Sequence, residues 1–130
     1  MNTFNIASIK AQVYRKPVET PIRTSFGIMR DRPAVVIRVE DQEGTVGWGE
    51  TWCNFPAVGA EHRARLINEN CAEILCGQDW SSPRAAFAGL TSQLHVLAIQ
   101  TAEPGPIAQS IAGIDIALWD MAAKRAGTPL

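Results

Sequence analysis

The sequence predicts an α+β domain in which a three-stranded antiparallel meander precedes a bundle of about three helices. In the first half of the chain, apolar residues recur at every second position, which is typical of half-buried strands. In the second half they recur at spacings of three and four, which is typical of amphipathic helices. The 130 residues suit one domain, and a hydrophobic content of 46% is enough to build its core.

The strand pattern occurs three times before residue 52. The first two strands carry alternating apolar residues at Ile9, Ala11 and Val13 and at Val35, Ile37 and Val39. A charged turn over residues 41–44 follows, in which Gly44 is available for a positive φ angle. The segment 46–51 then predicts a third strand, which makes a hairpin with the second.

The third strand carries glycine on one side, at Gly47 and Gly49. Glycines in a strand indicate that another element approaches the backbone closely. We expect Trp48 and Glu50 on the other side to have structural roles, with the Trp48 ring in the core. Residues 17–32 are rich in proline, threonine, serine and glycine, so they are predicted to form a long loop.

Three helical segments are predicted after residue 59. The first has its apolar face at Ala60, Ala64, Ile67, Cys71 and Ile74 and ends at Gly77. The second begins with Ser82 as N-cap and Pro83 at the first helical position, and it buries Phe87, Leu90 and Leu94. A break at Glu103–Pro106 precedes the third, which buries Ile107, Ile111, Ile114, Leu118 and Met121 and ends at Gly127.

Polar residues on the third helix fall on two sides. Gln109, Asp120 and Lys124 share a polar side, and Asp120 and Lys124 are four residues apart. Asp115 instead falls on the apolar side, where an unpaired carboxylate would cost several kcal/mol. We expect it to bond backbone N–H groups or a basic side chain; a catalytic role is the alternative.

Charge and composition exclude several classes of protein. A net charge of −1 argues against nucleic-acid binding, and the absence of an 18-residue apolar run argues against a membrane span. Residues 1–40 nevertheless hold seven basic and three acidic side chains. Arg23, Arg30 and Arg32 lie in or beside one loop, which is either a solvated basic loop or a patch that attracts an anionic ligand.

Residues 1–10 lack the layout of a signal peptide, and the three cysteines have no metal-type spacing. These features predict reduced thiols in a cytoplasmic protein, with Cys71 in the core. The sequence contains no nucleophile motif and no phosphate-binding glycine loop. His62 and His95 are isolated, and we assign both to structure. We predict no catalytic residue and no metal ligand in this chain.

Three motifs resemble a known family. The run Ala112–Asp120, with Lys124 and Gly127–Leu130, resembles the helix that ends the N-terminal domain in the mandelate racemase and muconate lactonizing enzyme branch of the enolase superfamily. Val46–Glu50 resembles the last strand of that domain's sheet, and Arg23–Gly27 resembles its first capping loop. The motifs occur in the family's order and cover nearly the whole chain.

The resemblance implies that residues 1–126 form a capping domain and that residues 127–130 begin the linker into a (β/α)₈ barrel. That barrel, of about 250 residues, is absent from this chain. The family abstracts a proton α to a substrate carboxylate, and barrel residues hold Mg²⁺ against the developing charge. The parent would then be an isomerase or lyase acting as racemase, dehydratase or cycloisomerase, whereas the 130 residues alone would be inactive and bind no Mg²⁺.

By the same resemblance, two segments close the barrel mouth over a carboxylate substrate, residues 19–32 and 52–58. Their candidate substrate-capping residues are Arg23, Thr24, Ser25, Phe26 and Arg30 in the first, and Trp52, Asn54 and Phe55 in the second. The expected partners are the substrate, the chain's own barrel and further copies in a homo-oligomer, with no nucleic acid and no membrane. The alternative is a free-standing α+β binding or dimerisation module without catalysis.

Overall fold

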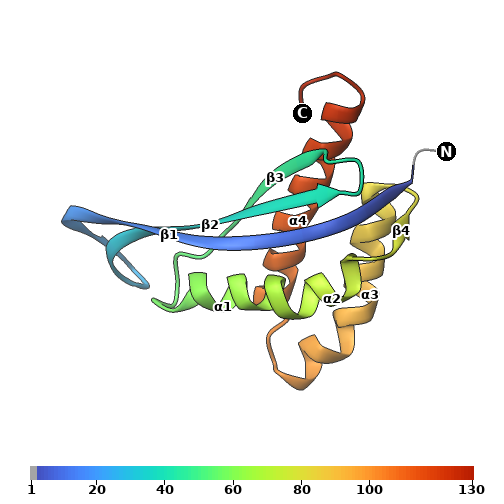
Figure 1. The fold of residues 1–130 in the computed structure, drawn as a ribbon. Coiled ribbons are helices and arrows are strands. Elements are labelled where there is room, and N and C mark those ends of the chain that lie inside the picture. Colours follow the sequence, from blue (N-terminus) through green and yellow to red (C-terminus); the bar gives the residue numbers. More distant parts are fainter. Residues whose placement is uncertain (1–2) are drawn as a thin grey trace.

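A computed structural model describes residues 3–130 as an antiparallel sheet packed against helices (Figure 1). The strands are β1 (Phe4–Thr24), β2 (Gly27–Asp41), β3 (Val46–Thr51) and β4 (Asp79–Trp80). The helical segments are α1 (Gly59–Arg65), the π-helical η1 (Leu66–Cys71), α2 (Ala72–Leu75), α3 (Pro83–Gln100) and α4 (Pro104–Arg125). The predicted α+β class, with a meander followed by helices, is confirmed.

The sheet has the order β3-β2-β1-β4, so β2 and β1 are central. Cross-strand pairing aligns the alternating residues into rows, such as Ala11 with Ile37 and Ile37 with Gly49. The added strand β4 pairs only with the start of β1, at Phe4 and Asn5. One face of the meander is therefore apolar and covered by helices.

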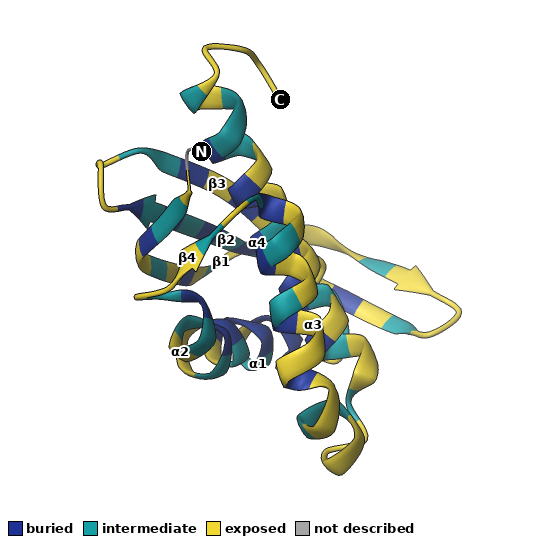
Figure 2. Ribbon diagram, turned by 90° about the vertical axis from the view of Figure 1, so that its right-hand side faces the viewer, coloured by how far each residue is buried: buried dark blue, intermediate teal, exposed yellow. Residues whose placement is uncertain are grey.

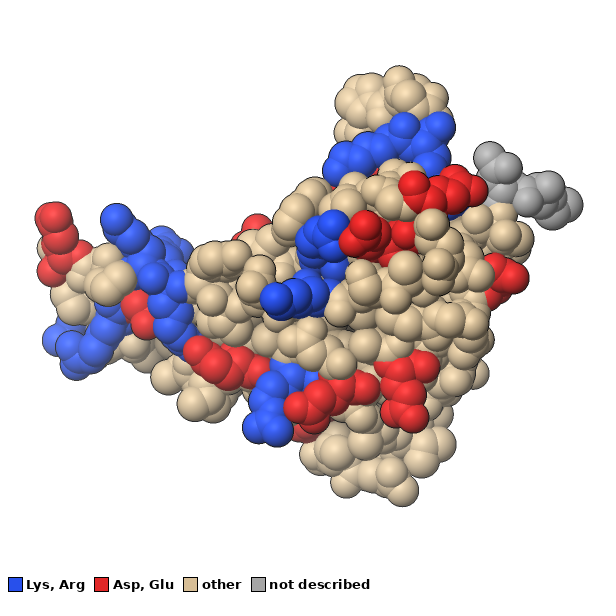
Figure 3. Space-filling view, viewed as in Figure 1, with Lys and Arg blue, Asp and Glu red and all other residues tan. Residues whose placement is uncertain are grey.

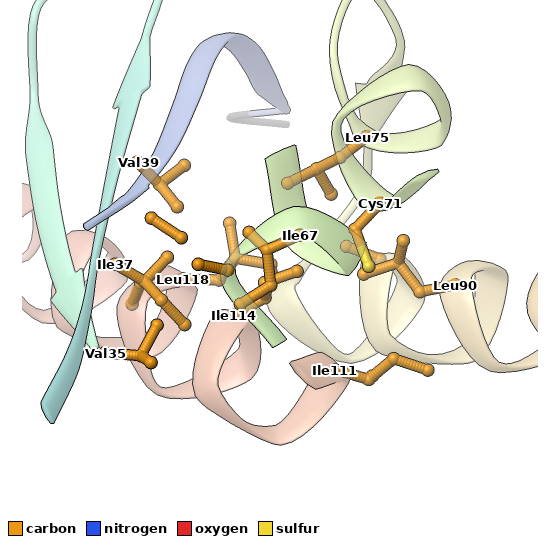
Figure 4. Packing of buried hydrophobic residues seen from close by; sticks show 14 of the residues in the cluster. Val35, Ile37, Val39, Ile67, Cys71, Leu75, Leu90, Ile111, Ile114 and Leu118 are labelled. Atoms are coloured by element: carbon orange, nitrogen blue, oxygen red, sulfur yellow. The ribbon is translucent and has the colours of Figure 1, made fainter. Parts of the chain in front are cut away.

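The core lies between that face and the helices (Figure 4). Val35, Ile37 and Val39 of β2 point toward Ile114 and Leu118 of α4 and toward the helix that runs from α1 to α2. All five residues predicted for the buried face of α4 are buried, and Cys71 is buried as predicted. The helical periodicity therefore identified the buried face of α4 correctly. On α3, Leu90 and Leu94 are buried as predicted, but Phe87, also predicted to be buried, is 41% exposed because it lines an open hollow between α3 and α4.

The helix ends agree with the predicted capping residues, except at the start of α4. Ser82 Oγ accepts a hydrogen bond from the Ala85 amide at 3.1 Å, so it caps α3 as predicted. The first helical run leaves helical geometry at Cys76, and Gly77 follows with a φ of +73°. The prolines after Glu103 were predicted to break the chain, but Pro104 begins α4, because proline is tolerated where the first N–H groups have no partner.

Helix α4 crosses β3 at the two glycines. A Cβ atom at Gly47 would overlap the carbonyl oxygen of Ala117, and one at Gly49 would overlap that of Gly113. The prediction that another element approaches these glycines is confirmed, and that element is α4. Helix and strand thus meet backbone to backbone.

Polar side chains of α4 form hydrogen bonds with backbone groups at the free edge of β3. Asp120 Oδ2 accepts the Trp48 amide at 2.8 Å, and Lys124 Nζ donates to the Val46 carbonyl at 2.9 Å. Lys124 also pairs with Asp120 at 2.7 Å, and this bond is the main cause that lowers the pKa of Asp120. These two bonds satisfy one N–H and one C=O group of the edge strand and so reduce the template that it offers for pairing with another chain.

Residues 17–32 do not form the predicted loop. They continue β1 and β2 into a long hairpin, with a shift in register between Pro17 and Ile22. Proline misled the prediction, because it is tolerated in a strand whose N–H side has no partner. Since β3 pairs with β2 only over residues 35–40, the hairpin beyond that point has two free edges. We call its residues 16–32 the arm.

Two further expectations fail. The Trp48 side chain, expected in the core, is 47% exposed, because glycine and threonine on the other face of β3 contact α4. Asp115 lies beside Arg84, Phe87 and Trp119. Burial raises its pKa and a hydrogen bond with Trp119 partly offsets that effect; within residues 3–130 no basic side chain, Arg84 included, lies within ion-pair distance of its carboxylate.

Candidate functional site

The arm projects from the body of the domain and is mostly exposed (Figures 1 and 2). Its tip is a tight turn in which the Phe26 amide donates to Thr24 Oγ1 and Thr24 Oγ1 donates to the Gly27 carbonyl, both at 3.2 Å. Such hydroxyl contacts fix a turn locally. They leave the Phe26 ring 91% exposed, with Arg23 and Ser25 also exposed.

Residues 52–58, which we call the cap loop, lie against the arm. A Cβ atom placed on Gly27 would be 3.3 Å from Cε1 of Phe55, so the Phe55 ring packs at the turn. The two segments proposed to close over the substrate are therefore in contact, although residues 33–51 separate them in the sequence.

A cavity of about 360 Å³ lies between the arm and the cap loop, and we call it the lid cavity. Its lining residues are Arg15, Ile28, Met29, Arg30, Asp31, Asn54, Phe55 and Ala57. Three of the eight predicted site residues, Arg30, Asn54 and Phe55, are thus brought together. Arg23, Thr24, Ser25 and Phe26 lie at or beside the tip, and Trp52 lies outside the cavity.

Arg15 lines the lid cavity and connects the segments around it. The sequence did not identify it as a site residue. Its guanidinium donates to both oxygens of Glu61, at 2.9 and 2.6 Å, and to both oxygens of Asp31, at 3.0 and 3.2 Å. A further hydrogen bond reaches the Ala57 carbonyl at 2.7 Å. The Glu61 bond is the main cause that raises the pKa of Arg15 and lowers the pKa of Glu61.

Unpaired positive charge remains on the arm. Figure 3 shows Lys and Arg side chains along the projecting hairpin. Among the described residues, Arg23, Arg30 and Arg32 have no acidic side chain within ion-pair distance, whereas Asp31 is already bound by Arg15. The lid cavity therefore presents one uncompensated guanidinium, from Arg30, beside the amide of Asn54. Both groups suit a carboxylate.

Trp52 is fixed to the body of the domain instead. The guanidinium of Arg63 lies 5.8 Å from the centre of its ring, a cation–π geometry. Arg63 is buried and donates to the Gln109 side chain at 2.9 and 2.6 Å, and burial is the main cause that lowers its pKa. Half of the Trp52 side chain stays exposed.

A second hollow of about 240 Å³ lies between α3 and α4. Its walls are mainly apolar, with Phe87, Leu94 and Ile107 among them, and His95 and Thr91 supply its side-chain polarity. The other histidine, His62, lies 2.9 Å from Glu103 and joins α1 to the start of α4. Because binding sites need convergent polar groups, the lid cavity is the better candidate.

Two kinds of feature are missing from the part of the chain that the structure describes. Within residues 3–130, His, Cys, Asp and Glu side chains nowhere gather in a group of three that could hold a metal ion. Over the same residues, each helix is too short or too polar to cross a membrane. The cysteines in this range, Cys53, Cys71 and Cys76, are free thiols.

Proteins that are similar to this chain in sequence and fold are about three times longer. A crystal structure of a mandelate racemase/muconate lactonizing enzyme from Bordetella bronchiseptica RB50 matches with a TM-score of 0.86 and 52% identity, over 97% of this chain and 32% of that one. A racemase from Streptomyces coelicolor A3(2), solved with bound magnesium, matches with a TM-score of 0.79 and 26% identity, over 93% of this chain and 32% of its own.

A curated relative from Streptomyces coelicolor, 3,6-anhydro-alpha-L-galactonate cycloisomerase, is 29% identical over 126 residues, which are 96% of this chain and 33% of the relative. The chain therefore spans about a third of the length of these relatives. The family model for the N-terminal domain of mandelate racemase and muconate lactonizing enzyme matches residues 8–130. The chain belongs to this family of N-terminal capping domains in the enolase superfamily.

Proposed function

We propose that this domain covers the mouth of a (β/α)₈ barrel and that its arm and cap loop contact a carboxylate substrate there. The barrel supplies Mg²⁺ ligands and the bases that remove the proton α to the carboxylate. One observation supports this role above the others: two segments distant in sequence meet around a cavity that holds an uncompensated cation and an amide. Such groups orient an acid without reacting with it.

Each lid residue has a distinct part in this proposal. Arg30 and Asn54 bind polar groups of the substrate, and Phe55 excludes water from the cavity. Phe26, at the exposed tip, covers the substrate when the domain lies on the barrel, with Arg23, Thr24 and Ser25 beside it. Trp52, supported by Arg63, forms the border of the lid on the scaffold side.

The proposal divides the chain at residue 126, with residues 127–130 leading into the barrel. The reaction is a racemisation, a dehydration or a cycloisomerisation, since all three begin with removal of the same kind of proton. The relatives named above include a racemase and a cycloisomerase. The proposed location is the cytoplasm, which the three free cysteines support.

The experiment compares the full-length product of the coding region with residues 1–130 alone. Both are incubated in D₂O with Mg²⁺ and a panel of α-hydroxy acids and acid sugars, and exchange of the α-hydrogen is followed by NMR. We expect Mg²⁺-dependent exchange by the full-length product and none by residues 1–130, which should bind Mg²⁺ no tighter than about millimolar. Exchange by residues 1–130 alone, or none by a full-length product that contains a barrel, would contradict the proposal.

A second candidate function, a free-standing dimerisation module, is favoured by the outer face of α4. Ile116 and Trp119 on this face are 45% and 46% exposed, and Ala112, one helical turn before Ile116, is exposed as well. In our proposal the barrel covers part of this face; in the alternative a second copy does. Sedimentation over a roughly hundredfold range of concentration tests whether the full-length product forms the predicted homo-oligomer, and whether residues 1–130 dimerise alone.

A further inference from the structure

We infer that Arg15 is a positioning residue that fixes the arm and the cap loop to each other and to α1. Its effect on turnover rests on the proposed function; its effect on the structure does not. The guanidinium touches a different element on each side: Asp31 in the arm, Ala57 in the cap loop and Glu61 in α1. No other side chain described here hydrogen-bonds to all three.

The arm needs such a contact because the sheet does not hold it. Beyond the last pair of β2 with β3, at Val35 and Thr51, the arm is a two-stranded ribbon. An isolated two-stranded hairpin is at best marginally stable in water. Among the hydrogen bonds of residues 3–130, those of Arg15 alone connect the arm to the cap loop.

The residue type matters as well as the charge. Arginine offers five N–H donors in a planar fork, and Arg15 uses them on two carboxylates and one carbonyl. Lysine would place a single ammonium group at this point, which cannot pair in bidentate fashion with both Asp31 and Glu61. Without any cation here, the two carboxylates would repel each other and push the arm away from α1.

The same contacts decide which cation faces a ligand. Arg15 lines the lid cavity, but its charge is compensated by Asp31 and Glu61. Arg30 lines the same cavity and is the cation left for a substrate. Arg15 thus sets the position of Arg30 and Asn54 rather than binding substrate itself.

The structural test uses the 130-residue chain. Backbone ¹⁵N order parameters are measured for the arm tip and the cap loop in the native chain, in Arg15→Gln and in Arg15→Lys. In both variants we expect the values in both segments to fall from about 0.85 to below about 0.6, while β3 and α4 keep theirs. The matched control is Arg65→Gln, because Arg65 is exposed and, among the described residues, forms an ion pair only with Glu69, at 3.3 Å; it should change neither segment.

The outcomes separate the possible roles of Arg15. Order lost in both segments supports the inference, and loss of the same order in Glu61→Gln supports it independently. Unchanged order parameters in Arg15→Gln would overturn it. Full order in Arg15→Lys would overturn the claim that the planar fork is required.

The functional test uses the full-length product and the substrate found by the exchange panel. Arg15→Lys should lower kcat/KM about tenfold, mainly through KM, with a change in Tm of no more than a few degrees; Arg65→Gln should change neither. Equal loss in kcat and kcat/KM with KM unchanged would overturn the positioning role. A full-length product with no exchange activity would instead refute the proposed function, while the order parameters would still decide the role of Arg15.

Discussion

The two ends of the same sheet are held by different interactions. At the scaffold end, β3 and α4 meet through glycines, so their backbones are in direct contact and the adjoining core is buried. At the arm end, the strands have no third partner and an exposed set of hydrogen bonds from Arg15 fixes their position. Under the proposed function, stability and ligand contact belong to opposite ends of the sheet, so substitutions should separate the two.

The largest loss of stability is expected for Gly49→Ala, because the new methyl group would overlap the carbonyl oxygen of Gly113. Overpacking of this kind costs about 3 kcal/mol or more of unfolding free energy when neither backbone can move. The matched control is Gly105→Ala, where an added Cβ meets no atom within 4 Å. Within a helix that change should be neutral or stabilising by up to about 1 kcal/mol. Urea unfolding measures both, and equal stability in the two variants would contradict the packing account.

Asp41→Asn should rank second. The Asp41 side chain is fully buried, accepts the Glu43 and Thr45 amides, and pairs with Arg125 at 2.7 Å. Losing the charge leaves the partly buried Arg125 with only the longer, exposed ion pair to Glu43, at 3.6 Å, which costs about 2–3 kcal/mol.

Because of Asp41, the free energy of unfolding should fall at acidic pH. Burial alone would raise its pKa, but the two amides and Arg125 together lower it below the usual value. The stability that this carboxylate contributes is therefore complete above the unfolded pKa of about 4 and is lost as the pH falls through the folded pKa. Unfolding titrations below about pH 5 should show a shallower pH dependence for Asp41→Asn than for the native chain. Identical slopes would show that Asp41 titrates alike in both states.

Trp48→Ala should have a smaller effect than its size suggests. Since about half of the side chain is exposed, the apolar area lost from burial is worth about 1–2 kcal/mol rather than the 3–5 kcal/mol typical of a core aromatic residue. Thermal unfolding measures the difference. A loss as large as that of Gly49→Ala would place the ring in the core after all.

Phe26→Ala should have the smallest effect on stability, within about 0.5 kcal/mol, because the ring is 91% exposed at the tip. In the full-length product it should nevertheless lower kcat/KM by about tenfold, since the proposed role of this ring is to exclude water from the substrate. A variant with unchanged kinetics on the best substrate would remove Phe26 from the lid.

The scaffold could be predicted from the sequence because its signals are local. Apolar spacing identified the buried face of α4, and Gly47 and Gly49 indicated the close approach of another element to β3. Periodicity could not predict which element packs against each face of a strand. Trp48 occupies an alternating position that is typical of a core residue. However, α4 packs against the glycines on the opposite face of β3, so the Trp48 ring lies on the face of the sheet that α4 does not cover.

The arm and its anchor were not predictable in the same way. Prolines at 17 and 21 indicate a loop unless one knows that this part of β1 has a free edge, which is a property of the tertiary structure. Arg15, Asp31 and Glu61 lie far apart in the sequence, and nothing local distinguishes this arginine from its basic neighbours. The family resemblance is what predicts the lid segments, whereas only the fold shows which hydrogen bonds connect the two segments.

Native-state hydrogen exchange on the 130-residue chain tests the division into scaffold and lid most directly. We predict that amides in β3 and α4 exchange only through global unfolding, so their opening free energies equal the unfolding free energy. Amides at the arm tip and in the cap loop should exchange through local opening, at least about a hundredfold faster. Equal opening free energies in the two regions would show that the domain opens as one unit, which would contradict the assignment of stability and ligand contact to opposite ends of the sheet.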